Sequence, residues 1–347
     1  SVSMETIDAF SEQDYRDLVV LFNLSWTGER WIERDAFLRS LRLKCRGYTE
    51  EEKSGLLAKH MDIVRTVVPY YRKLSESGVI EITTSPFYHP IGPLLMDVSA
   101  ALESRPETTL PSVRFDGKRD LEWHVDEAIA MHHRLFGQRP FGMWPSEGGI
   151  SESFASLSAM KGFRWIASDE EVLHYSLLKG NQGDVLSDHF SPLIFKTDDT
   201  SINVIFRDHL LSDLIGFVYS KWPAREAADD LVLRIKDASL RVTESERPPL
   251  VSIILDGENP WESYPDDGLE FLRFLYEKLS TDPSIECVQV CEYLDRYPES
   301  RTIKCINAGS WINHDFNIWI GHSEDRAAWE MTANARKELL SVEGKID

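Results

Sequence analysis

The chain has 347 residues, 42% of them hydrophobic, which suits one barrel-sized domain with a smaller appendage and argues against disorder. Its net charge of −20, from 38 basic and 58 acidic residues, argues against nucleic-acid and membrane partners, since both attract basic surfaces. No apolar run approaches the roughly 20 residues of a membrane helix. The 4 cysteines include no CxxC pair, which favours a reducing, cytoplasmic compartment. We therefore expect an uncharged substrate.

Strand-like and helix-like segments alternate along almost the whole chain. In order, the predicted strands are 17–24, 79–86, 140–146, 163–169, 193–197, 202–208, 250–257 and 285–293. The predicted helices begin with one that a capping box of Thr49 and Glu52 opens and that runs towards Gly78. The others are 118–136, 151–161, 209–220, 223–242 and 267–280.

Alternating strands and helices predict a parallel sheet or barrel, and the number of strands favours a barrel. After about residue 300 the pattern changes to GSWINHDFNIWIGH and a final helix at 326–340. We therefore expect an α/β fold with a (β/α) barrel over 1–300. Residues 301–347 are expected to begin a helical region that packs on the barrel mouth.

Two carboxylates follow predicted strands. Asp256 comes directly after the apolar run 251–255, and Glu147 follows 140–146 beside two glycines, which permit close approach of a ligand. In α/β barrels the catalytic side chains lie at the C-terminal ends of strands. A pair of acids in such positions is typical of enzymes that cleave glycosidic bonds. The residues alone leave open a helix N-cap for Asp256 and an ordinary surface glutamate for Glu147.

Two more strand ends carry polar side chains. The segment SPFYHPIGPLL presents Tyr88 and His89 on a loop fixed by prolines, although a rigid turn with a buried histidine is the alternative. In FRDHLLSD, Arg207 and Asp208 are placed to bind sugar hydroxyls or to orient a catalytic carboxylate. An ordinary ion pair at the start of a helix explains them equally well.

The tryptophans add a second indication of a sugar site. The chain has 10 of them, and several stand beside polar or acidic residues, namely Trp144, Trp261, Trp311 and Trp319. Aromatic faces stack on the C–H faces of pyranose rings, but about half of these side chains are expected to fill the core instead. The histidines show neither HxxxH nor HExxH spacing, so no metal site is predicted.

Long segments of the chain resemble, in order, the motifs of glycoside hydrolase family 57, whose members act on α-glucans through an incomplete (β/α)7 barrel. They are IEITTSPFYHPIGPLL (80–95), FGMWPSEGGIS (141–151), FRDHLLSDLIGF (206–217) and VSIILDGENPWESY (251–264). The segment GSWINHDFNIWIGH (309–322) is similar to the tryptophan-rich region that follows the family's barrel.

The resemblance implies a retaining mechanism, with Glu147 as nucleophile and Asp256 as general acid/base. It implies an α-glucan or maltooligosaccharide substrate and no cofactor. The side chains that it places at the substrate, together with Trp311 from the tail, are His89, Trp144, Arg207, Asp208, Glu258 and Trp261.

Two family features are absent from the sequence, because no HQP-type motif precedes 17–24 and the C-terminal helical region stops after one helix. We therefore expect a strand edge near 17–24 that is open to pairing with a second copy, giving a homo-oligomer. One alternative function is a non-catalytic α-glucan-binding relative. The other is a metal-dependent polysaccharide deacetylase-like barrel, whose His/His/Asp cluster the histidine spacing does not supply. The sequence does not choose among hydrolysis, chain transfer and branching.

Overall fold

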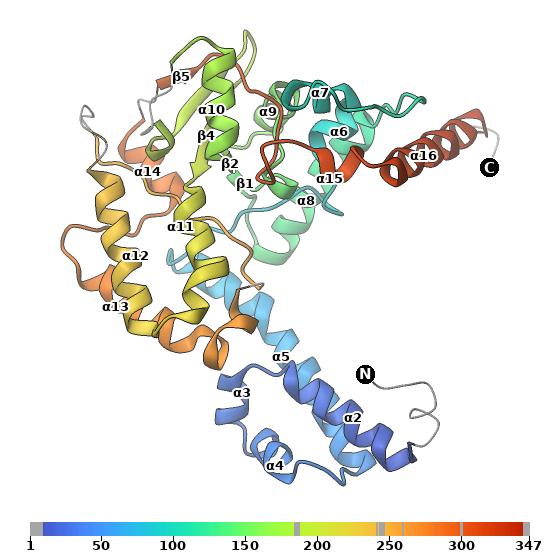
Figure 1. The fold of residues 1–347 in the computed structure, drawn as a ribbon, viewed down its shortest axis with the longest axis vertical. Helices are drawn as coiled ribbons and strands as arrows, with labels where there is room; N and C mark the ends of the chain where they lie inside the picture. Colours follow the sequence, from blue (N-terminus) through green and yellow to red (C-terminus); the bar gives the residue numbers. More distant parts are fainter. Residues whose placement is uncertain are drawn as a thin grey trace.

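The computed structural model describes residues 10–183, 188–240, 242, 247–258, 260–298 and 301–342. Its main body is built around a five-stranded sheet with the order β1-β2-β4-β3-β5 (Figure 1). The strands are β1 (Gly142–Met143), β2 (Trp165–Asp169), β3 (Leu193–Lys196), β4 (Ser201–Arg207) and β5 (Arg301–Ile303). All neighbours are parallel except β3 and β4. The pairing of β2 with β4 sets Asp169 opposite Arg207, so two polar residues lie side by side at the C-terminal ends of these strands.

Three helices supply the main core on one face of the sheet. These are α8 (Lys118–Phe136), α9 (Glu152–Met160) and α10 (Glu170–Lys179), whose apolar residues pack with those of β2, β3 and β4. A second core joins α11 (His209–Asp213), α12 (Ala224–Ser239) and α13 (Leu269–Thr281). Shorter helices are α6 (Gly92–Met96), α7 (Ala101–Ser104), α14 (Val290–Arg296) and α15 (Asn317–Ile320).

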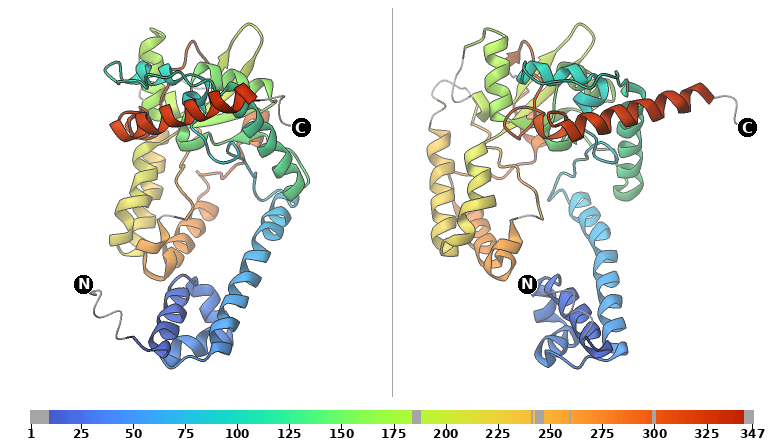
Figure 2. Two further views of the ribbon diagram at one scale, coloured as in Figure 1. Left: turned by 90° about the vertical axis from the view of Figure 1, so that its right-hand side faces the viewer. Right: turned by 45° about the vertical axis from the view of Figure 1, so that its right-hand side comes forward.

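The N-terminal helices form a separate group with a core of their own. They are α2 (Glu12–Ser25), α3 (Glu29–Arg34), α4 (Ala36–Lys44) and α5 (Glu50–Glu76). Figure 2 shows this group apart from the sheet, with the long α5 leading back to it. At the other end of the chain, α16 (Ser323–Val342) projects from the main body (Figure 1). Among the described helices, none combines the length and the apolar character needed to cross a bilayer.

The predicted strand at 17–24 is wrong, because these residues belong to α2. Ser11 and Asp14 form a capping box at its start, and Val20 and Leu24, four residues apart, are buried on one face of the helix. The segment therefore has no strand edge that a second copy of the chain could pair with. The homo-oligomer stays a prediction, but the strand edge on which it was based is not present.

Three other predicted strands do not form as regular strands. In 79–86 a single residue, Thr84, pairs with Met143 of β1, because Pro86 interrupts the segment. Residues 285–289 are irregular and lead into α14, so 285–293 was a wrong strand prediction. Segment 250–257 is extended without a ladder. The α/β fold class is nevertheless confirmed, and the short open sheet fits an incomplete barrel.

Most of the predicted helices are confirmed. Thr49 caps α5 as expected, and the helices predicted at 118–136, 151–161, 223–242 and 267–280 are α8, α9, α12 and α13. The final helix is α16. The helix predicted over 209–220 is divided into α11, a π-helical turn and a 3₁₀ turn. The proposed division of the chain at residue 300 stays a prediction, and β5 begins one residue beyond it.

Candidate active site

Glu147 lies on a tight turn just beyond β1, with its carboxylate held between two side chains. One carboxylate oxygen, Oε1, lies 3.2 Å from Nε2 of His89, and the other, Oε2, accepts a hydrogen bond of 2.8 Å from the indole Nε1 of Trp311. The backbone at Glu147 has a φ of 57°, which few non-glycine residues adopt. Backbone geometry and two partners from distant segments therefore fix the direction of this carboxylate.

Trp311 is itself held on three sides. Its backbone N–H donates to the carbonyl of Glu147 at 3.1 Å, which joins the tail to the turn after β1. Its ring makes an edge-to-face contact with Trp144, with centroids 5.1 Å apart, and the guanidinium Cζ of Arg207 lies 5.1 Å from its centroid. The indole is thus packed between an aromatic ring and a cation.

Asp256 lies next to last in the extended segment 250–257, whose side chains alternate as in a strand. Leu250 and Ile254 pack on the side of β2 and β4, whereas Val251, Ile253 and Leu255 pack on the core of α12 and α13. The run therefore packs on both of its faces, with its side chains partly buried. Its backbone meets β4 only beyond that strand's end, where the Asp208 N–H donates to the Ser252 carbonyl at 2.8 Å.

Glu147 and Asp256 line one cavity of about 660 Å³. Arg207 and Trp311 line it as well, and so do His209 and Asp213 at the start and end of α11. The remaining lining residues are Ser212, Gly216, Phe217, Leu255, Pro260, Glu262, Ser263, Ile312 and Asn313. Polar groups thus converge with an aromatic ring in a space large enough for sugar rings.

Three of the lining residues, Arg207, His209 and Asp213, form a closed ring of ion pairs with the buried Asp169. Asp169, which has no exposed surface, lies 2.9 Å from Arg207 Nε and 3.1 Å from His209 Nδ1, both measured to its Oδ2. Asp213 completes the ring, 2.6 Å from Arg207 Nη2 and 3.0 Å from His209 Nε2. The hydrogen bond to Asp169, with the charges of both aspartates, raises the pKa of His209 to about 9.

Three members of this ring, Asp169, His209 and Asp213, were not predicted from the sequence. A signal was available for Asp169, which ends the apolar run FRWIASD as Asp256 ends its own. Nothing in the linear pattern indicated that Asp169 and Arg207 would share a register position on neighbouring strands.

Of the other predicted substrate residues, Trp144 packs against Trp311 and Gly148. Trp261 packs against Tyr264 and donates to the carbonyl of Gly257 at 2.7 Å, and its neighbours in sequence line the cavity. Glu258 is exposed and is not among the lining residues. The substrate roles of Trp144, Trp261 and Glu258 stay predictions.

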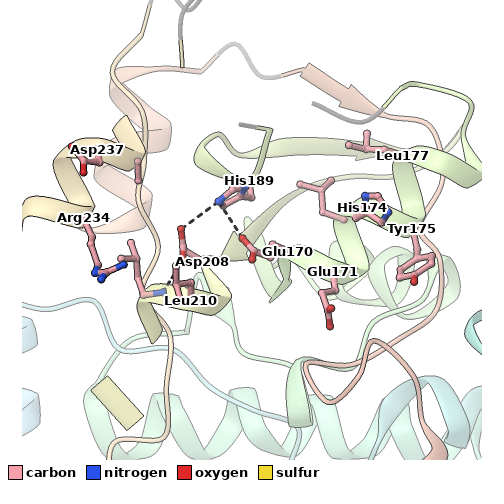
Figure 3. A pocket seen from close by; sticks show the side chains of 13 residues that line it. Glu170, Glu171, His174, Tyr175, Leu177, His189, Asp208, Leu210, Arg234 and Asp237 are labelled. Atoms are coloured by element: carbon pink, nitrogen blue, oxygen red, sulfur yellow. Dashed lines mark hydrogen bonds and ion pairs between the residues drawn. The ribbon is translucent and has the colours of Figure 1, made fainter. Parts of the chain in front are cut away.

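Asp208 faces a different cavity, of about 540 Å³, between α10, α11 and α12 (Figure 3). There Nε2 of His189 lies 3.1 Å from Oε2 of Glu170 and 3.4 Å from Oδ2 of Asp208. The other carboxylate oxygen of Asp208 accepts from the Leu211 N–H and caps α11. Burial raises the pKa of Glu170. The predicted contact of Asp208 with substrate stays a prediction, and the position favours a supporting role.

Two groups within the described residues bring one histidine and two carboxylates within 4.8 Å of one another. They are Asp169, Glu171 and His209, and Glu170, His189 and Asp208. In each group the histidine lies at ion-pair distance from a carboxylate, 3.1 Å in both cases.

The family model described as glycosyl hydrolase family 57 matches residues 2–305. The chain belongs to glycosyl hydrolase family 57. This confirms the resemblance that the sequence motifs indicated. No significant match was found among curated protein sequences.

Solved structures with a similar fold include a family 57 branching enzyme from Pyrococcus horikoshii, with a TM-score of 0.64 and 15% identity over 95% of this chain and 64% of that one. The α-amylase AmyC of Thermotoga maritima has a TM-score of 0.57 and 14% identity, covering 88% of this chain and 66% of its own. For 4-α-glucanotransferase from Thermococcus litoralis, the TM-score is 0.52 and the identity 18%, over 74% and 34% of the two chains. The chain thus spans 34% of that transferase and 64% of the branching enzyme, and these likenesses show the fold.

Proposed function

We propose that this chain carries a retaining catalytic centre for α-linked glucans, with Glu147 as nucleophile and Asp256 as general acid/base. The observation that supports it most strongly is that these two carboxylates, 109 positions apart by their residue numbers, line the same cavity. Family membership supports a glycoside hydrolase or transferase. Either activity acts on an uncharged sugar, as the acidic composition suggests.

In this proposal the Glu147 carboxylate attacks the anomeric carbon while protonated Asp256 gives its proton to the departing glycosidic oxygen. The bond from the anomeric carbon to that oxygen breaks and an ester to Glu147 forms. Asp256, now a carboxylate, then takes a proton from water or from a sugar hydroxyl. The oxygen of the water or of the sugar hydroxyl attacks the anomeric carbon, and the ester bond to Glu147 breaks. Water gives hydrolysis and a sugar hydroxyl gives transfer, both with net retention.

The surroundings of Glu147 suit a nucleophile. Each of its oxygens has one partner, and a carboxylate oxygen has a further lone pair for attack. The two partners restrict rotation of the carboxylate, so less conformational entropy has to be lost on reaching the transition state. Trp311 presents a ring at the cavity wall, on which a pyranose ring can pack.

The test is turnover of maltooligosaccharides of defined length, with products identified by chromatography and the first-formed anomer by ¹H NMR. We expect shorter or rearranged chains with the α-anomer formed first. Glu147→Gln and Asp256→Asn should each lower kcat by about 10³-fold or more. Matched controls are Glu330→Gln and Asp295→Asn, whose carboxylates bind Ser112 and Arg164 outside the cavity and should leave kcat unchanged.

Two other outcomes would contradict the proposal. Calorimetric binding of maltotriose without turnover would indicate a non-catalytic α-glucan-binding relative. Release of acetate from acetylated oligosaccharide in the presence of zinc would indicate the deacetylase-like alternative.

A further inference from the structure

Asp169 is a buried carboxylate with two separable tasks. Its Oδ1 accepts the backbone N–H of Glu171 at 2.9 Å and so caps α10. Its Oδ2 faces the two cations, Arg207 and His209. The contact of Oδ2 with Arg207 Nε is an ion pair at 2.9 Å that lacks the angle of a hydrogen bond. One oxygen thus caps the helix, and the other contacts two cations that line the cavity.

Two carboxylates hold the guanidinium group of Arg207. Its side chain is 6% exposed, and two carboxylates, those of Asp169 and Asp213, bind different nitrogens of its guanidinium. A planar group with two anchored nitrogens has little freedom to rotate. Its guanidinium carbon Cζ lies over the indole ring of Trp311, 5.1 Å from the ring centroid.

The contacts continue from this indole to the reacting carboxylate. The Nε1–H of Trp311 donates to Oε2 of Glu147 at 2.8 Å. A direct path therefore runs from Asp169 through Arg207 and Trp311 to Glu147. The first and last steps are short polar contacts and the middle one is a cation–π contact. Asp169 and Arg207 are buried, where water screens their charges little.

We propose that Asp169 is a positioning residue for the nucleophile, which holds the guanidinium of Arg207 against Trp311 and thereby keeps the indole N–H directed at Glu147. This proposal rests on the proposed function, because it assigns Glu147 as the nucleophile. Asp169 does not line the cavity and acts only through its neighbours. Displacing a supporting group by about 1 Å is enough to slow a reaction by about 100-fold.

Asp169→Asn separates this role from helix capping. Asparagine caps helices about as well as aspartate, so the bond from the Glu171 N–H is kept. The charge that holds Arg207 and His209 is lost. The matched control is Asp295→Asn, which removes the carboxylate partner of Arg164 outside the cavity. A second variant, Arg207→Lys, keeps a cation beside Asp169 but removes the guanidinium that lies over the Trp311 ring. It therefore tests the positioning role without neutralising the buried acid.

The first measurement needs no turnover. In ¹⁵N-labelled protein the indole resonance of Trp311 is assigned from its loss in Trp311→Phe, and its hydrogen-exchange rate reports the bond to Glu147. We expect faster exchange and a shifted resonance in both Asp169→Asn and Arg207→Lys, and neither change in Asp295→Asn. The histidine resonances provide a second check. The charged groups near His209 are Asp169, Asp213, Arg207 and Glu171, and the pKa of His209 should fall in Asp169→Asn because it loses the hydrogen bond to the Asp169 carboxylate.

The second measurement is turnover of a maltooligosaccharide. We expect kcat to fall by about tenfold or more in each variant. In Asp169→Asn, KM should stay within about threefold, because Asp169 does not line the cavity. The double variant should be little slower than either single one, since both interrupt the same path. Additive losses, or a folded Asp169→Asn protein with unchanged kcat and an unchanged Trp311 resonance, would overturn the positioning role.

Failure of the proposed function gives a different result. If the parent protein turns over no glucan, the catalytic assignment fails, and the Trp311 resonance still decides whether Asp169 controls the contact with Glu147. If Asp169→Asn does not fold, the positioning role is tested with Arg207→Lys instead, by the Trp311 indole resonance and by kcat. An unchanged indole resonance and unchanged kcat in that variant would also reject the proposal.

Discussion

Replacing Trp311 with phenylalanine should slow catalysis without unfolding the protein. The change removes the indole N–H that lies 2.8 Å from Oε2 of Glu147 but keeps an aromatic ring beside Trp144 and Arg207. A hydrogen bond to a charged group contributes roughly 1.5–3 kcal/mol. If the transition state depends on this bond in full, kcat should fall by about 10- to 150-fold. Because the ring remains in the cavity, KM should change much less.

The assay is steady-state turnover of a maltooligosaccharide at several substrate concentrations, with stability followed by urea unfolding. Trp319→Phe is the matched control, since Trp319 packs near Phe316 away from the cavity. It should leave kcat unchanged. If Trp311→Phe keeps kcat within about threefold of the parent, the indole bond does not orient the nucleophile. A rise in KM with kcat unchanged would make Trp311 only a binding surface.

Three further predictions concern stability, each measured as the free energy of unfolding in urea. His209 has a folded pKa raised to about 9, above its ordinary value of 6.5, so its stabilising contribution is complete below pH 6.5 and is lost as the pH rises through 9. After discounting for solvent screening we expect a loss of on the order of 1 kcal/mol across that window, absent in His209→Gln. A Cβ at Gly142 would lie 2.1 Å from the ring of Trp165, so Gly142→Ala should lower the free energy of unfolding by about 1–3 kcal/mol. In the control Gly216→Ala the added Cβ would have no neighbour within 4 Å among the described residues, and we expect no such loss of stability. Thr49→Ala removes the cap of α5 and should cost about 1 kcal/mol, and an unchanged midpoint would show that the capping box is dispensable.

The helices could be predicted well because their signals are local. Thr49 with Glu52, and the spacing of apolar residues in α8 and α13, lie within one or two turns. The strands were harder, because pairing partners lie far apart in sequence. The run DLVVLFNL at 17–24 has the composition of a strand, and only the start signal at Ser11 and Asp14 indicates a helix. Segment 250–257 has the alternation of a strand but lacks a neighbour to form a ladder.

The site was predictable in part for a related reason. Glu147 and Asp256 follow apolar runs, and the ends of neighbouring strands lie close together in α/β folds. The bond from Trp311 to Glu147 spans 164 positions, and the opposition of Asp169 to Arg207 depends on strand register. Neither follows from composition or periodicity. The ring of ion pairs around Arg207 therefore became visible only in three dimensions.

Covalent trapping tests the central assignment most directly. A fluorinated α-glucosyl fluoride that forms the glycosyl-enzyme quickly and hydrolyses it slowly should label one carboxylate of the parent protein. We predict that peptide mapping by mass spectrometry finds the sugar on Glu147, and that Glu147→Gln is not labelled. A label on Asp256 or on another residue, or no label on a protein that turns over maltooligosaccharides, would contradict Glu147 as the nucleophile.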